Sequence, residues 1–268
     1  MLTQKELYCD ITGERIASKI NLKTINGRIT ATNMDTGEAV NINKPIAVGT
    51  KLLVEVTPTS AATPELRVFK IKNTEYSAAS AMYTVTEDDI TIQVSFAASG
   101  APTIYPVFGD NDIEVITDCF DTNTAPDCWE PGDTINISDA NNNEVVWILV
   151  DKQKNRYEFA DGAGKSNNVL QAMYLLPDQR HFNATKKEVT IQIDGEDFTM
   201  NKYYAGGWCL SDLRDYLNGD YFNNLSEKLK GCLGKIKLYD KVIAGRLVDV
   251  GELYVPSYSP NGEPRPRS

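Results

Sequence analysis

The amino-acid sequence predicts a mainly β protein with a smaller α-helical part, an α+β fold. We expect a small antiparallel β module followed by a larger β-rich domain that carries two helices late in the chain. Short runs in which apolar and polar residues alternate recur before residue 100 and are typical of strands with one buried face. Apolar residues at helical spacing recur after residue 210.

Composition restricts the classes of function. The 268 residues include 27 basic and 37 acidic side chains, which gives a formal net charge of −10. An acidic chain is a poor partner for nucleic acid, because binding to phosphates needs a basic surface. No apolar run approaches the roughly 20 residues that span a bilayer. We therefore expect neither nucleic-acid binding nor insertion into a membrane.

The first residues of the chain and its cysteines indicate the cellular compartment in which the protein is made. The first residues are charged and lack the apolar stretch of roughly 7–15 residues that a secretory signal needs. The five cysteines are an odd number, include no CxxC pair and are dispersed, apart from Cys119 and Cys128. This pattern favours free thiols over a disulfide framework or a zinc site. We expect a product of the cytoplasm, unless a leader has been removed.

Residues 1–46 are predicted to form an N-terminal β arm or meander. Two short β patterns, at 28–32 and 38–42, flank the sequence Asp-Thr-Gly at 35–37. Gly37 can supply the positive φ angle that a tight turn between two strands requires.

Residues 47–98 are predicted to form a small antiparallel β module of four strands. In the first strand, Leu52, Val54 and Val56 share one face. The last strand, residues 90–96, has apolar residues at every second position, separated by Thr, Gln and Ser. This period of two predicts a strand whose other face is exposed to solvent.

The same stretch resembles a known family. Residues 49–58 (GTKLLVEVTP) are similar to the opening of the bacterial-repeat family (internalin-type B-repeats), and residues 83–96 (YTVTEDDITIQVSF) are similar to its ending. The family's central aromatic motif is replaced by LRVFKI at 66–71, without its tryptophan. The resemblance covers residues 49–96 in a single copy. It implies a spacer or binding module of surface proteins or phage structural proteins, with no catalytic residue.

The rest of the chain is divided by its glycine and proline residues. Residues 99–106 are predicted to be a linker, residues 107–255 an α+β domain, and residues 256–268 a proline-rich extended tail. Within the domain, the apolar run 145–150 is expected to be a buried strand that pairs with 156–159. Residues 189–200 have the pattern of a β-hairpin.

Two helices are predicted near the end of this domain. Ser211 can cap a short helix that ends at Gly219. Phe222, Leu225 and Leu229 then follow one another at helical spacing, which predicts a second, amphipathic helix.

Motifs for catalysis or metal binding are incomplete. The sequence DGAGKS at 161–166 lacks the first glycine of a phosphate-binding loop, which would stand at Phe159. The acidic stretches 110–114 and 139–144 offer oxygen ligands for calcium but not the spacing of an EF-hand, so solvated loops are the first expectation and a structural calcium site the second. His181 is the single histidine and no nucleophile motif accompanies it. We expect no enzyme and no cofactor, and assign no catalytic or metal-binding residue.

Two groups of residues are candidates for interaction with a partner. Tyr203, Tyr204 and Trp208 surround a glycine pair and could anchor a protein interface or stack on a sugar, or else pack inside the domain. Arg265 and Arg267 give the extended tail a basic end, which suits an acidic surface on a neighbouring subunit.

These observations favour a non-enzymatic structural or assembly protein of a phage virion. It would be an auxiliary or fibre-associated head protein or a tail component, made in the host cytoplasm and located in the virion with its β repeat facing outward. Its expected partners are other virion subunits, further copies of itself, and a glycan or protein of the host surface. The alternative is an adhesin or carbohydrate-binding module at the bacterial cell surface.

Overall fold

The computed structural model describes residues 16–152, 157–159, 165–166, 169–172, 188–193, 195–201, 211–234, 236–240 and 246–251. The chain divides into two compact units. Unit 1 comprises Met1–Asn111 and Ala125–Trp129, and unit 2 comprises Asp112–Thr124 and Glu130–Ser268. The fold is mainly β with a minor helical part, which confirms the fold class that the sequence predicts.

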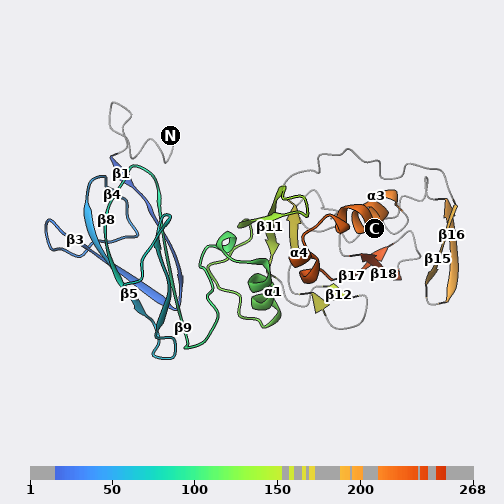
Figure 1. The fold of residues 1–268 in the computed structure, drawn as a ribbon, viewed down its shortest axis with the longest axis horizontal. Coiled ribbons are helices and arrows are strands. Elements are labelled where there is room, and N and C mark those ends of the chain that lie inside the picture. Colours follow the sequence, from blue (N-terminus) through green and yellow to red (C-terminus); the bar gives the residue numbers. More distant parts are fainter. Residues whose placement is uncertain are drawn as a thin grey trace. The chain divides into compact units, whose positions relative to one another are not determined.

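Unit 1 is a sandwich of two β-sheets, seen in the blue to teal part of Figure 1. The order of strands is β2-β9-β6-β7 in the larger sheet and β3-β5-β8 in the smaller one. The short strands β1 and β4 form a separate two-stranded sheet. The strands are β1 (Ala17–Ser18), β2 (Ile20–Ile25), β3 (Gly27–Asn33), β4 (Ile46–Ala47), β5 (Lys51–Pro58), β6 (Glu65–Ile71), β7 (Thr74–Glu75), β8 (Ser80–Thr84) and β9 (Ile90–Ala97).

The core of unit 1 lies between the two sheets and follows the alternation of the sequence. The prediction that Leu52, Val54 and Val56 share one buried face of β5 is confirmed. The apolar residues of β9 meet them from the opposite sheet, together with Phe69 and Ile71 of β6.

Strands β2 and β3 belong to this same core. β2 pairs in parallel with β9, and β3 pairs antiparallel with β5. Ile20 and Ala31 are buried in the core cluster. The ranges expected as separate elements, 1–46 and 47–98, therefore share one core in the part of the chain that is described. Alternation reveals which face a strand buries, but it does not reveal which strand lies next to it.

Unit 2 contains three small sheets with strand orders β10-β11-β14, β13-β12-β17-β18 and β15-β16. Its strands are β10 (Thr134–Ser138), β11 (Glu144–Asp151), β12 (Tyr157–Phe159), β13 (Lys165–Ser166), β14 (Val169–Ala172), β15 (Glu188–Ile193), β16 (Glu196–Asn201), β17 (Ile236–Asp240) and β18 (Arg246–Gly251). Its helical segments are α1 (Ile113–Asp121), α3 (Asp212–Tyr216), the π-helix η4 (Leu217–Tyr221) and α4 (Glu227–Cys232).

The predicted pairings in unit 2 are partly confirmed. β15 and β16 form the expected hairpin, with Ile193 opposite Glu196. The expected pairing of 145–150 with 156–159 is wrong, because β11 pairs with β10 and β14 whereas β12 pairs with β13 and β17. The short connection between 145–150 and 156–159 is the reason for predicting that they pair. The strand that follows β11 in sequence, β12, instead belongs to another sheet.

The late helices differ from expectation at their ends. The Ser211 side chain caps α3 as predicted, since its hydroxyl accepts from the backbone N–H of Arg214 at 3.0 Å. Gly219 does not end this helix, which continues as the π-helix η4. The second helix begins only after Ser226, whose hydroxyl accepts from the N–H of Leu229. Among the described residues, no helix has the length and apolar character to cross a bilayer.

Candidate functional site

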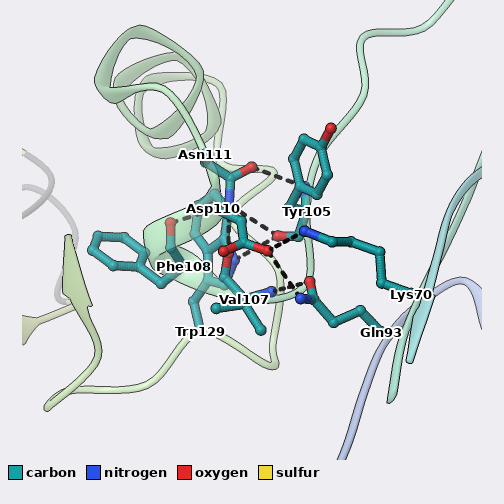
Figure 2. A network of polar contacts seen from close by, with 8 residues as sticks. All are labelled: Lys70, Gln93, Tyr105, Val107, Phe108, Asp110, Asn111 and Trp129. Atoms are coloured by element: carbon teal, nitrogen blue, oxygen red, sulfur yellow. Dashed lines mark hydrogen bonds and ion pairs between the residues drawn. The ribbon is translucent and has the colours of Figure 1, made fainter. Parts of the chain in front are cut away.

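A network of polar side chains in unit 1 lies against the outer face of its larger sheet (Figure 2). We call this group the clasp; its members are Lys70, Gln93, Tyr105, Asp110, Asn111 and Trp129. They come from β6, from β9, from the segment 105–111 and from the segment 125–129. Residues that are far apart in the sequence thus meet at one place.

The strands place the first two members of the clasp side by side. Lys70 of β6 and Gln93 of β9 are directly opposite each other in the antiparallel register. Both side chains point away from the core, at positions that the period of two predicts to be exposed. That prediction is wrong for Gln93, which is only 5% exposed, and for its neighbour Ser95. The physical reason is that β9 is covered on both faces.

The carboxylate of Asp110 joins the covering segment to both strands. One of its oxygens, Oδ2, accepts from Lys70 Nζ at 3.0 Å and from Gln93 Nε2 at 2.9 Å. The other end of the Gln93 amide is also used, since its Oε1 accepts from the backbone N–H of Val107 at 3.3 Å. A buried amide whose donor and acceptor are both paired avoids the cost of burying a polar group without partners.

Asn111 fixes the shape of the covering segment itself. Its side-chain Oδ1 accepts from the N–H of Tyr105 at 2.8 Å. Its Nδ2 donates to the carbonyl oxygens of Tyr105, Val107 and Phe108, at 3.0, 2.9 and 3.2 Å. One buried side chain therefore holds together a segment that has little regular secondary structure, apart from the 3-10 turn η2 (Phe108–Asp110).

Aromatic rings complete the clasp. Trp129 is fully buried, and its ring meets that of Phe108 edge to face, with 5.4 Å between centroids. Its indole N–H donates to the carbonyl oxygen of Tyr105 at 3.1 Å. The ammonium group of Lys70 lies 5.4 Å from the centroid of the Tyr105 ring, a favourable cation–π distance. Figure 2 shows these rings around the ion pair.

The polar groups of the clasp are paired with other groups of the protein. Asp110 is neutralised by Lys70, and the Gln93 and Asn111 amides are directed at protein partners. In the described part of the chain, no three His, Cys, Asp or Glu side chains are grouped as metal ligands would be. What the arrangement does physically is hold residues 105–111 and 125–129 against β6 and β9.

The acidic stretches considered for calcium have structural roles in this fold. In 110–114, Asp110 belongs to the clasp, whereas Asp112 caps α1 and pairs with Lys228 of α4. The hydrogen bond from Lys228 lowers the pKa of Asp112. In 139–144, the carboxylate of Asp139 accepts from the side chain and backbone of Asn143, and from the backbone of Asn141. These bonds lower the pKa of Asp139 and shape the turn between β10 and β11.

The interaction residues expected from the sequence lie outside the described residues. These are Tyr203, Tyr204, Trp208, Arg265 and Arg267. The clasp is not among the sites that the sequence predicts, although Tyr105, Phe108 and Trp129 offer a signal. Large aromatic residues within and just after an expected linker, such as Tyr105 and Phe108, indicate that the segment packs against other residues.

Comparison with known proteins finds no match: no family model, no curated protein and no solved structure is similar to this chain. The resemblance of residues 49–96 to the bacterial-repeat family therefore stays a prediction.

Proposed function

We propose that the protein is a non-enzymatic structural or assembly protein of a phage virion, an auxiliary or fibre-associated head protein or a tail component. The observation that carries the proposal is the contrast between the two outer faces of unit 1. The clasp covers part of the outer face of the larger sheet, whereas the outer face of the β3-β5-β8 sheet is exposed in the described part of the chain. A module with one covered and one exposed sheet face is suited to presenting the exposed face to a partner.

The outer face of the β3-β5-β8 sheet is suited to contact with a partner. Thr30 of β3, Glu55 of β5 and Met82 of β8 are exposed on it, and Met82 is 73% exposed. Methionine has a flexible side chain and is over-represented at binding surfaces that accept several partners. The proposed partners of this outward-facing module are other virion subunits and a glycan or protein of the host surface.

The proposal also accounts for the cysteines and the charge. Cys119 and Cys232 are free thiols, which is compatible with a protein made in the host cytoplasm. The net charge of −10 favours solubility before assembly and disfavours binding to packaged nucleic acid. The resemblance of residues 49–96 to a repeat of surface and phage structural proteins supports the same assignment.

The direct test is the composition of particles. Cells that carry the gene with its neighbouring genes are induced, and particles are purified by density gradient. We expect mass spectrometry to find this chain at a constant ratio to the major head or tail protein. We expect antibodies raised against unit 1 to label intact particles. Absence from particles, together with recovery at the bacterial cell surface and a signal sequence upstream of Met1, would instead establish the adhesin.

The proline-rich tail gives a second test of the same proposal. A chain truncated after Val255 lacks Arg265 and Arg267 and is expected to melt like the full chain but to lose binding to the particle. The double substitution of both arginines by alanine is the matched control for the loss of length, and we expect it to weaken binding as well. Unchanged incorporation of both variants would exclude the tail as an assembly arm.

A further inference from the structure

Strand β8 is an edge of the β3-β5-β8 sheet. Among the described strands, β8 is hydrogen-bonded to β5 alone. Its backbone groups can be assigned to the two sides of the strand, because Val85 N donates to Thr50 O and Val56 N donates to Ala79 O, both at 2.9 Å. In an antiparallel ladder such bonds occur at every second residue. The N–H and C=O groups of 80, 82 and 84 therefore point away from β5.

The three outward positions of β8 can pair with a second copy of themselves. If two β8 strands run antiparallel about a two-fold axis at Met82, then Ser80 faces Thr84 of the other copy and Met82 faces Met82. All three are hydrogen-bonded pairs of an antiparallel ladder, so about six backbone hydrogen bonds can form. The ladder of β5 and β8 is left intact.

The side chains at this edge suit the same pairing. Ser80, Met82 and Thr84 are exposed and lie on the outer face of the sheet. Ser and Thr can hydrogen-bond across strands, and two methionines can pack at the axis. Leu53 is opposite Met82 in the β5-β8 register, which extends the apolar contact on each side.

Charge distinguishes β8 from the other edges of the sandwich. Residues 76–86 contain no charged side chain, although the chain as a whole has a net charge of −10. Natural edge strands are commonly protected by lysines, by very short length or by a covering segment. β2 has exposed Lys19 just before it, β7 has two residues, and the edge of β3 is covered by Val40, whose N–H donates to Ala31 O. Among the described edges of unit 1, β8 has none of these protections.

We propose that two copies of this chain associate through their β8 strands, with Met82 at the two-fold axis, to form a continuous six-stranded sheet. The partner is thus a second copy of this chain, and the pairing does not depend on the role in a virion. Edge pairing buries little surface, well under the roughly 1,200 Å² of a standard interface. The association is therefore weak in solution and gains strength where many copies are held together.

The experiment uses the full chain in sedimentation velocity from about 10 µM to about 1 mM. We compare the natural chain with Met82→Lys and Met82→Glu, which place like charges at the axis. Each variant alone is expected to associate about two- to fivefold more weakly than the natural chain, because like charges face each other across the strands. An equimolar mixture of the two is expected to associate again, because Lys then faces Glu. Thr30→Lys and Thr30→Glu change the charge on the same face but at β3, and are expected to associate like the natural chain.

A second variant acts through the backbone. Met82→Pro removes an N–H that points away from β5, so the sandwich keeps its ladder while the proposed pairing loses a donor. The proposal is overturned if the natural chain stays monomeric up to about 1 mM, if the Met82 variants associate as the natural chain does, or if the Lys and Glu mixture fails to associate.

Discussion

Gln93 and Asp110 join strand β9 to the segment that covers it through a hydrogen bond of 2.9 Å between the amide nitrogen and a carboxylate oxygen. Gln93 is buried, and the same carboxylate oxygen also accepts from Lys70. The bond gives the buried amide a partner in place of water, and the Lys70 ammonium neutralises the charge of the carboxylate. It therefore fixes β9 and its cover as one structural unit.

Replacing Asp110 by alanine is expected to destabilise unit 1. The substitution leaves the buried Gln93 amide and the Lys70 ammonium without their shared partner, which corresponds to a loss of about 1–2 kcal/mol in the free energy of unfolding. Differential scanning calorimetry of the full chain measures this loss. Asp35→Ala is the control, because Asp35 is exposed and lies 3.9 Å from Lys51, and it should change the stability by less than about 0.5 kcal/mol. Equal losses for both variants would show that the clasp contributes nothing.

Asn111 is expected to be the most sensitive polar position of the clasp. Asn111→Ala removes four hydrogen bonds to backbone groups of the segment 105–111 and leaves those groups unpaired, so we expect a loss of about 2–3 kcal/mol. Urea unfolding followed by circular dichroism measures it. Asn111→Asp keeps the acceptor for Tyr105 N but loses the donors, and should be nearly as damaging. Asn73→Ala, at an exposed turn, should be neutral.

Gly27 allows close contact between the two sheets of unit 1. A Cβ atom at Gly27 would lie 2.7 Å from Val94 Cγ1 and 3.1 Å from Phe96 Cδ2. Gly27→Ala is therefore expected to cost about 1–3 kcal/mol. Adding Val94→Ala should recover part of this cost, so that the double variant is more stable than the sum of the single losses predicts. At Gly219 an added Cβ meets nothing within 4 Å, and Gly219→Ala should change little.

Cys119 is expected to make stability depend on alkaline pH. Burial raises the pKa of this thiol above its usual value near 9.0. The unfolded chain then loses the proton first, so the contribution of Cys119 to stability is complete below about pH 9 and decreases as the pH rises above it. The measurement is the difference in melting temperature between the natural chain and Cys119→Ala from pH 7 to 10.5, and this difference should shrink with pH. A constant difference would contradict the prediction.

The strands of the sandwich could be predicted because burial leaves a local trace. Leu52, Val54 and Val56 repeat with a period of two, and so do the apolar residues of β9. The pairing of β2 with β9 left no such trace, because nothing in the alternation of either strand specifies a neighbour about 70 residues away. The sequence pattern also does not predict that β2 and β9 run parallel.

The clasp could not be predicted because its members are separated in the sequence. Gln93 reads as a solvent-facing residue by its position in β9, and only the position of Asp110 in space changes that assignment. Asn111 reads as a turn or ligand residue, whereas it bonds the carbonyl groups of its own segment. Sequence patterns predict only whether a residue faces the core or the solvent. In the clasp, a second segment of the chain takes the place of the solvent.

The parallel pairing of β2 with β9 has a mechanical consequence. β2 stands near the N-terminal end of unit 1 and β9 near the end of the sandwich, and they run in the same direction over six residue pairs, from Ile20 opposite Ile90 to Ile25 opposite Ser95. Tension applied between the start of β2 and the end of β9 acts along the strands and loads all of these bonds together. An antiparallel pair pulled at its adjoining ends would instead open one bond at a time. Pulled in this direction, the pair of β2 and β9 therefore separates only when these hydrogen bonds break together.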